Sequence, residues 1–349
     1  MKKANRSSRR KFLSNAGKAS LGAAIAVNFP TIVPASVFGK NAPGNLINVA
    51  SIGCGRISIS HDMTAIARYP GARIMAVCDV DRDRAAAGPA AVKSNYEKAG
   101  HFNGGLKGDW KIDVYHDYKE LLQNKDIDAV HISLPDHQHA IVAVHAVNAR
   151  KDVYLQKPAS LTIEEGRILS DAVKRSGRTL QMGSQQRSID PWPQFKRVCE
   201  LVRNGRIGTL KAVEVGLPGD PGGGNKIPMS LPANLDYDAW LGATPEVYYT
   251  EDRVHAQDAS VKGITSRPGW LRCEEFGAGM ITGWGAHHID TAHWGMGTEL
   301  TGPIEIWGHA NFPTDDPEYK GLWDVHGIFR TEALYANGVQ MIVSNELPN

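Results

Sequence analysis

Two groups of residues in this sequence have side chains suited to moving a proton. The first is Lys157, which follows an apolar stretch and precedes a proline. A lysine partly removed from water has a lowered pKa, so it can exchange a proton with a hydroxyl, or it can stay cationic and stabilise an alkoxide. The second group lies in the Gly-rich segment 277–297, which holds His287 and Asp290 one helical turn apart. Because the segment has only i, i+3 carboxylate spacing and no HExxH pattern, zinc binding is the less favoured interpretation, and we predict no metal site.

A third pattern is suited to binding a dinucleotide. Two glycines follow an apolar run with GxGxxG spacing, and Ser58 takes the third position. The first glycine permits a tight turn, and the second lets backbone N–H groups approach a pyrophosphate at the start of a helix. An aspartate follows the next apolar run, where a carboxylate binds the ribose hydroxyls of NAD and repels the 2′-phosphate of NADP. The residues predicted to bind NAD here are Gly53, Gly55, Arg56, Ile57 and Asp79, and Arg82 leaves NADP open as the alternative.

These residues require a sheet whose strands end at one edge. The runs 46–53, 73–78 and 129–134 are largely apolar, as in strands buried on both faces of a parallel sheet, and helical stretches separate them. This alternation predicts the α/β class, with an N-terminal Rossmann domain, a doubly wound parallel sheet, at 45–184. Lys157 then leaves a strand at the carboxyl edge, where open α/β folds bind their ligands.

The second half predicts a different kind of domain. The run 210–217 alternates apolar and polar side chains, as in a half-exposed antiparallel strand, and 325–333 and 339–347 are expected to form a strand pair. We therefore predict a C-terminal α+β domain at 185–349 that binds substrate and mediates oligomerisation, with an open, mostly antiparallel sheet that is cut short. The Gly- and Pro-rich loop 218–232 is predicted to be a lid, an oligomer arm or a disordered insertion.

Three segments resemble the Gfo/Idh/MocA oxidoreductases, the family of glucose–fructose oxidoreductase and inositol dehydrogenase. They are 126–130 (DIDAV), 135–139 (PDHQH) and 153–158 (VYLQKP), and the resemblance extends over nearly all of the chain after residue 45. The family usually has Glu where this chain has Gln156, and Asp where it has Gly283. The resemblance implies further cofactor-binding residues, which are Leu134, Pro135, His139, Gln156, Lys157 and Gln185.

The resemblance also implies roles at the substrate. Lys157 and His287 would handle the proton of the oxidised hydroxyl, and Asp290 would position His287 or bind a substrate hydroxyl. These three are the predicted catalytic residues, with His288 as the alternative base. The predicted substrate-binding residues are Lys157, Gln186, Arg187, His287, His288 and Asp290. By family habit we expect a homo-oligomer, either a dimer or a tetramer.

The distribution of charge predicts export. The 349 residues include 39 Lys and Arg against 37 Asp and Glu, a net charge of +2, yet 1–18 holds seven basic residues and no acid. An apolar run and small residues follow, and 8–13 (SRRKFL) resembles a twin-arginine signal. We predict a signal peptide and linker at 1–40 and a periplasmic mature chain, whose mild acidity argues against nucleic-acid binding. No apolar run has the length of a membrane span, and the four cysteines are predicted to be small core residues.

These expectations together predict an exported sugar or glycoside dehydrogenase that uses NAD, with NADP as the alternative, and keeps the cofactor tightly bound. Two other functions stay open. The first is a glycosidase that oxidises a sugar carbon transiently, eliminates the aglycone and re-reduces the carbon. The second is a non-catalytic sugar sensor, which the departures at Gln156 and Gly283 would suit.

Overall fold

The computed structural model describes residues 46–100 and 110–347. The predicted export signal lies outside the described residues. The first half contains a six-stranded, entirely parallel sheet in the order β3-β2-β1-β4-β5-β6, which confirms the predicted α/β class and doubly wound sheet. Its strands are β1 (Ile47–Ile52), β2 (Ala72–Cys78), β3 (Asp113–Tyr115), β4 (Ala129–Ile132), β5 (Asp152–Leu155) and β6 (Leu180–Met182).

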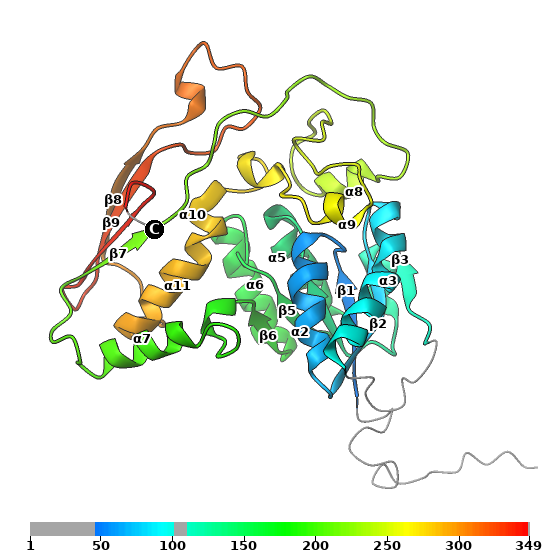
Figure 1. Ribbon diagram of the computed structural model, residues 1–349, viewed down its shortest axis with the longest axis horizontal. Coiled ribbons are helices and arrows are strands. Elements are labelled where there is room, and N and C mark those ends of the chain that lie inside the picture. The colour runs from blue at the N-terminus through cyan, green and yellow to red at the C-terminus, as the bar shows by residue number, and fades with distance from the viewer. Residues whose placement is uncertain (1–45, 101–109, 348–349) are drawn as a thin grey trace, which may run out of the picture. The chain divides into compact units, whose positions relative to one another are not determined.

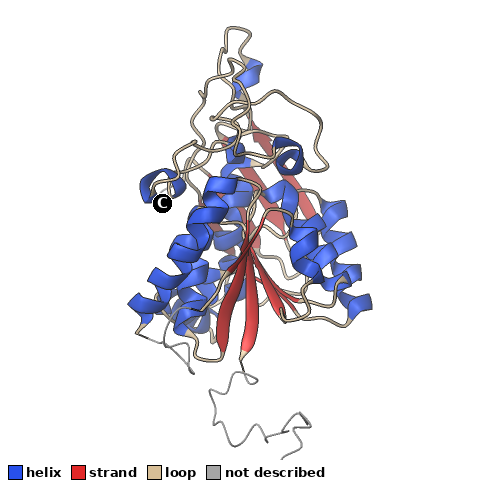
Figure 2. Ribbon diagram, turned by 90° about the vertical axis from the view of Figure 1, so that its right-hand side faces the viewer, coloured by secondary structure: helices blue, strands red, loops and turns tan. Residues whose placement is uncertain are grey.

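Helices cover both faces of this sheet (Figure 2). Helix α6 begins with a capping box, in which the Thr162 side chain accepts from the Glu165 N–H while Glu165 reaches back to the Thr162 N–H, and it ends at Gly177 with φ +65°. Helix α2 packs on α3, and α5 packs on α6. The helices of this half are α2 (Met63–Arg68), α3 (Arg82–Ala99), α4 (Tyr118–Gln123), α5 (Asp136–Asn148) and α6 (Ile163–Ser176).

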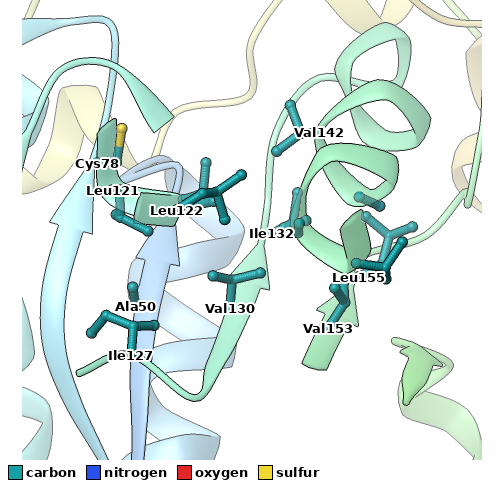
Figure 3. Packing of buried hydrophobic residues seen from close by; sticks show 14 of the residues in the cluster. Ala50, Cys78, Leu121, Leu122, Ile127, Val130, Ile132, Val142, Val153 and Leu155 are labelled. Atoms are coloured by element: carbon teal, nitrogen blue, oxygen red, sulfur yellow. The ribbon is translucent and has the colours of Figure 1, made fainter. Parts of the chain in front are cut away.

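The largest buried cluster fills the space between the sheet and helices α4 to α6 (Figure 3). Ala50 and Ile132 contribute from the central strands, Leu121 from α4, and Val142 from α5, and each is at most 2% exposed. This packing fixes the carboxyl ends of β1 and β4 side by side. The strand order reverses between these two strands, which is where open α/β sheets bind ligands.

The second half contains a four-stranded sheet in the order β7-β10-β9-β8, whose strands are β7 (Ala212–Gly216), β8 (Glu305–Ala310), β9 (Phe329–Leu334) and β10 (Gln340–Ser344). The pairs β10–β9 and β8–β9 are antiparallel, as expected of a mostly antiparallel sheet. The expectation for 210–217 was wrong in one respect, because β7 pairs with β10 in parallel. A long crossover that contains helices and the strands β8 and β9 separates β7 from β10 in the chain, so no hairpin forces these two strands to run in opposite directions.

Helices of this crossover lie against the second sheet (Figure 1). Helix α11 contacts both α7 and β7. The loop 218–232 is packed against the segment that precedes β9: the Gly223 N–H donates to the Tyr319 hydroxyl at 2.7 Å, and the Gly223 carbonyl accepts from the Trp323 N–H at 2.9 Å. The helices of this half are α7 (Pro193–Arg203), α8 (Tyr237–Leu241), α9 (Val261–Ile264), α10 (Gly279–Gly283) and α11 (Gly285–Met296).

The four cysteines are free and buried, as predicted for small core residues. Within the described ranges, no helix has both the length and the apolar character needed to cross a membrane.

Candidate active site

A cavity of about 760 Å³ lies at the carboxyl edge of the parallel sheet. Residues at the ends of β1, β2, β4 and β5 and the turn after β6 form one wall, and residues from the second half form the other. Most of the predicted cofactor residues line it: Gly53, Gly55, Arg56, Ile57, Asp79, Leu134, Pro135, His139, Gln156, Lys157 and Gln185.

The turn after β1 can pass close to the backbone after β4 only because it begins with glycine. Gly53 has φ +95°, and a Cβ atom there would overlap the Ser133 carbonyl oxygen on β4's side of the turn. Ser58, at the third position, is fully buried, and its hydroxyl lies 3.1 Å from that of Ser51 in β1. The helix and strand approach closely here, and the turn between them lines the cavity, which fits a bound pyrophosphate.

Asp79 is held rigidly beside this turn. One carboxylate oxygen accepts from the Cys54 N–H at 2.8 Å and the other from the Asp81 N–H at 2.9 Å. This leaves lone pairs on a fixed carboxylate, as ribose hydroxyls require. Arg82, in contrast, is exposed and outside the cavity lining, and the nearby arginine that lines the cavity is Arg84.

Lys157 is half-buried and reaches across to the second half of the chain. Its Nζ donates to the Gly283 carbonyl at 3.0 Å, and its bond to Pro158 is cis. Burial lowers the pKa of Lys157, opposed by the nearby Asp136 carboxylate. Gly283, which stands where the family usually has Asp, thus accepts a hydrogen bond from Lys157 through its backbone carbonyl.

His139 lines the cavity with one ring nitrogen free. Its Nδ1 lies 2.6 Å from the Pro158 carbonyl, which can only accept, so Nδ1 carries the proton. Nε2 is then a bare acceptor, and it is buried with no partner among the described residues. Burial lowers the pKa of His139 to about 4, which keeps the ring neutral. An unpaired acceptor here fits a hydroxyl of the nicotinamide ribose.

His287 faces the same cavity from α11. Burial lowers its pKa to about 4, reinforced by the Lys157 ammonium, and its Nδ1 is buried without a partner in the described part of the chain. Its ring lies beside Trp284, with centroids 5.7 Å apart. At neutral pH the imidazole is therefore uncharged and able to accept a proton.

The remaining predicted substrate residues do not line this cavity. Asp290 receives two hydrogen bonds from Arg187, at 2.7 and 2.8 Å, so its carboxylate is committed to the guanidinium rather than to His287. Gln186 accepts from the Thr291 hydroxyl at 2.9 Å. His288 lines a second cavity of about 610 Å³ between α7, α11 and β7. The hydrogen bonds that join Asp290 and Thr291 to the turn after β6 fix α11 to that turn and thereby position His287.

The structure adds residues to the site that the patterns did not indicate. Asp136 is fully buried at the start of α5, and burial raises its pKa to about 7. Arg267, from the loop after α9, lines the cavity near Lys157 and Arg56 and acts on the pKa of both. Asp136 lies in the segment 135–139 that carries the family resemblance and follows a strand, so the sequence held a signal for it. Arg267 lies in a segment without any motif.

The described residues hold no group of three His, Cys, Asp or Glu side chains placed to bind a metal.

Comparisons with known proteins agree with this geometry. A model described as an oxidoreductase family, NAD-binding Rossmann fold, matches residues 47–184, and one described as an oxidoreductase family, C-terminal alpha/beta domain, matches 221–348. An inositol 2-dehydrogenase 2 of Saccharopolyspora erythraea is 30% identical over 168 residues, covering 48% of this chain and 44% of that protein. Glycosyl hydrolase family 109 protein 1 of Shewanella sp. (strain ANA-3) is 29% identical over 216 residues, covering 58% and 44%. The chain thus spans less than half the length of these curated relatives.

Two solved structures share the fold. The WlbA dehydrogenase from Bordetella pertussis, in complex with NADH and UDP-GlcNAcA, has a TM-score of 0.56 at 17% identity, covering 86% of this chain and 70% of that chain. A putative myo-inositol dehydrogenase from Sinorhizobium meliloti 1021 has a TM-score of 0.51 at 20% identity, covering 85% and 68%. At these identities the likeness concerns the fold alone.

Proposed function

This chain belongs to the Gfo/Idh/MocA oxidoreductase family, and we propose that it is an NAD-dependent dehydrogenase of a ring hydroxyl on a sugar or glycoside. The observation that carries the proposal is the position of Lys157 and His287 on one cavity beside the glycine turn and Asp79. Burial lowers the pKa of both side chains, which leaves His287 neutral and able to accept a proton at neutral pH and makes the Lys157 proton easier to release.

The residues at the edge of the sheet would hold the cofactor. When bound, NAD supplies a nicotinamide ring that accepts a hydride from carbon or returns it. The turn from Gly53 to Ile57 would hold the pyrophosphate, Asp79 the adenine ribose, and Nε2 of His139 a hydroxyl of the other ribose. The fixed carboxylate of Asp79 favours NAD over NADP because it repels a 2′-phosphate.

Lys157 at the end of β5 and His287 on the opposite wall would manage the hydroxyl proton. In this proposal the neutral His287 accepts the proton from the reacting hydroxyl, and Lys157 donates a hydrogen bond to the same oxygen as negative charge develops on it. Asp290 would act indirectly. Arg187 binds its carboxylate, and this ion pair anchors α11, which carries His287. Reduction of a keto-sugar would run the same steps in reverse.

A panel of sugars and glycosides, followed by NADH absorbance with and without a keto-sugar acceptor, tests this function. Lys157→Met should lower kcat/KM by about a thousandfold, within the range for loss of one proton-transfer or electrostatic group. Lys174→Met, which removes an exposed lysine of α6, is the matched control and should leave turnover unchanged. Turnover that survives Lys157→Met would overturn the assigned chemistry.

The similarity to a glycosyl hydrolase family 109 protein supports a second candidate, a glycosidase that oxidises and re-reduces one sugar carbon while eliminating the aglycone. A nitrophenyl glycoside distinguishes the two functions. Release of nitrophenol without net NADH supports the glycosidase, and NADH formation without nitrophenol supports the dehydrogenase. A non-catalytic sugar sensor would bind sugar, give neither product and be insensitive to Lys157→Met.

We further propose that the protein is exported by the twin-arginine pathway with its cofactor already bound, because fresh NAD is scarce outside the cytoplasm. The support is the basic, apolar and small-residue order of 1–40. Fractionation of cells that express the natural chain or an Arg9→Lys/Arg10→Lys variant tests export, and the variant should stay cytoplasmic. Protein purified from the periplasm without dinucleotide would contradict the tightly bound cofactor.

A further inference from the structure

A row of buried polar side chains runs from Lys157 away from the cavity and into the sheet. The Gln156 side-chain oxygen accepts from the Lys157 N–H at 3.2 Å, and its amide nitrogen donates to Asp62 Oδ1 at 2.8 Å. Asp62 Oδ2 lies 2.9 Å from His131 Nε2, and His131 Nδ1 lies 3.0 Å from the Ser51 hydroxyl. Apart from Lys157, each of these residues is at most 4% exposed.

The chemistry of a carboxylate fixes the direction of the hydrogen bonds that Asp62 makes. An ionised Asp62 can only accept, so Gln156 must turn its NH₂ toward it and His131 must carry its proton on Nε2. The Gln156 oxygen is then left to accept from the Lys157 backbone N–H. Because buried polar groups are costly when unpaired, this arrangement leaves a single low-energy orientation for Gln156.

The turn that carries Asp62 is itself irregular. Residues 58–62 form a π-helical turn, η3, in which Ser58 and Asp62 are both buried. Such widened turns occur often at functional sites, because they redirect a side chain that a regular helix would point elsewhere. Here the turn aims the Asp62 carboxylate beneath the strand end that carries Lys157.

Asp62 also contributes charge to the lysine. It raises the pKa of Lys157, together with Asp136, against the lowering effects of burial, Arg56 and Arg267. His287 faces Lys157 from α11 and His139 from α5, both with pKa values lowered to about 4 by burial.

Three further polar side chains surround Asp62. They are His131 from β4, Gln156 from the end of β5, and Tyr154, whose pKa burial raises to about 12 with a contribution from Asp62. Asp62 is thus a buried negative charge separated from the lysine by one carboxamide.

We propose that Asp62 is a positioning residue for Lys157, holding its backbone through Gln156 and supplying a buried negative charge that acts on its ammonium group. Only the catalytic consequence rests on the proposed function, since the arrangement itself is independent of substrate. One requirement follows directly: position 156 must be an amide while position 62 is a carboxylate. A glutamate at 156, the residue usual in the family, would place two carboxylates in hydrogen-bond contact.

A charge-exchange cycle tests this requirement. Gln156→Glu should lower the thermal midpoint by roughly 5–10 °C, because one of two buried carboxylates must take up a proton or repel the other. Asp62→Asn should lower it as well, since its NH₂ group would face that of Gln156. The double variant Asp62→Asn/Gln156→Glu should recover most of the loss, because the amide at position 62 can donate to the carboxylate at position 156 and still accept from His131. Losses that simply add in the double variant, or a double variant that does not fold, would overturn the proposal.

A second readout concerns the charge on Lys157. Acetic anhydride modification across a pH series, quantified by mass spectrometry of the peptide that contains Lys157, reports its titration, and the exposed Lys174 in the same sample is the internal reference. Asp62→Asn should shift the Lys157 midpoint to lower pH by about half a unit to one unit, while Lys174 stays unchanged. An unchanged Lys157 midpoint would overturn the proposal even if the stability cycle behaved as expected.

Turnover then separates this proposal from the proposed function. If a sugar substrate is found, the alkaline limb of the pH–rate profile, where Lys157 loses its proton, should move to lower pH in Asp62→Asn. If the wild-type protein turns over no sugar, the dehydrogenase assignment fails, while the stability cycle and the lysine titration still decide the role of Asp62.

Discussion

Asp136 and Lys157 form a buried pair in which desolvation acts against both charges. Burial raises the pKa of Asp136 to about 7 and lowers the pKa of Lys157, although each partner's charge offsets part of the shift. Burial therefore moves the pKa values of the two groups toward one another. An acid and a base whose environments push their pKa values toward one another are suited to passing a proton.

The pKa of Asp136 predicts a pH-dependent effect on stability. Its folded-state value, about 7, lies above the unfolded value of 3.8, so its contribution is fully present below pH 3.8 and is lost as pH rises through 7. Asp136→Asn should therefore stabilise the protein at pH 8, by on the order of 2 kcal/mol, and change little at pH 4. Urea unfolding at the two pH values measures the difference. An equal change at both would contradict the raised pKa.

Asp79 predicts the cofactor preference. Asp79→Ala removes the acceptor for the ribose hydroxyls and the charge that repels a 2′-phosphate. NAD should therefore bind about tenfold more weakly, and the affinity for NADP should rise relative to the affinity for NAD. Titration calorimetry with both dinucleotides measures the ratio. Arg82→Ala, which changes an exposed side chain outside the cavity, is the control and should leave the ratio unaltered.

Residues at strand ends could be predicted from the sequence, and residues defined by distant contacts could not. Lys157 and Asp79 end apolar runs, and parallel strands bring such ends to one edge. Asp62 has no such signal, because its partners His131 and Gln156 are far away in the chain and the π-helical turn that aims it leaves no recognisable pattern. The partnership of Asp290 with Arg187 was likewise hidden, since helical spacing relates Asp290 only to its own helix.

At the scale of elements, the turn after β1 depends on Gly53. Gly53→Ala would combine a φ of +95° with a Cβ atom that overlaps a backbone oxygen, so we expect a loss of roughly 3 kcal/mol in unfolding free energy and weaker NAD binding. Gly177→Ala is a matched control, because Gly177 also has positive φ (+65°) but nothing near the Cβ position. It should cost about 1 kcal/mol. Equal losses would show that the close approach at Gly53 is unimportant.

The sequence predicted the strands of the parallel sheet, but it did not predict the direction of β7. The segments that form β1, β2 and β4 are largely apolar and separated by helices, so the alternation of strands and helices could be predicted. The direction of β7 could not be, because alternation reports that one face is exposed and says nothing about whether the neighbouring strand runs parallel or antiparallel. Its partner β10 comes from the other end of the domain.

At the scale of the molecule, the exposed strand β8 bears on the expected homo-oligomer. β8 is an edge strand within the described sheet, and it carries Ile306 and Trp307, which are 68% and 46% exposed. An exposed apolar edge favours pairing with a second copy. Ile306→Lys should therefore shift the protein toward monomers in light scattering. Ile163→Lys, at a 95% exposed position on α6, should leave the mass unchanged, and a wild-type monomer would contradict this interface.

The parallel pairing of β7 with β10 has a consequence for how the chain is made. Everything from α8 to β9 is synthesised between the two strands, so β7 emerges long before its only neighbour in the described sheet exists. Pairings of such long sequence separation form slowly. Until they form, the apolar sides of α7, α11 and β7 that enclose the second cavity stay open to water. A nascent chain in this state is a natural client for a chaperone, and its rate of maturation should be set by the second sheet.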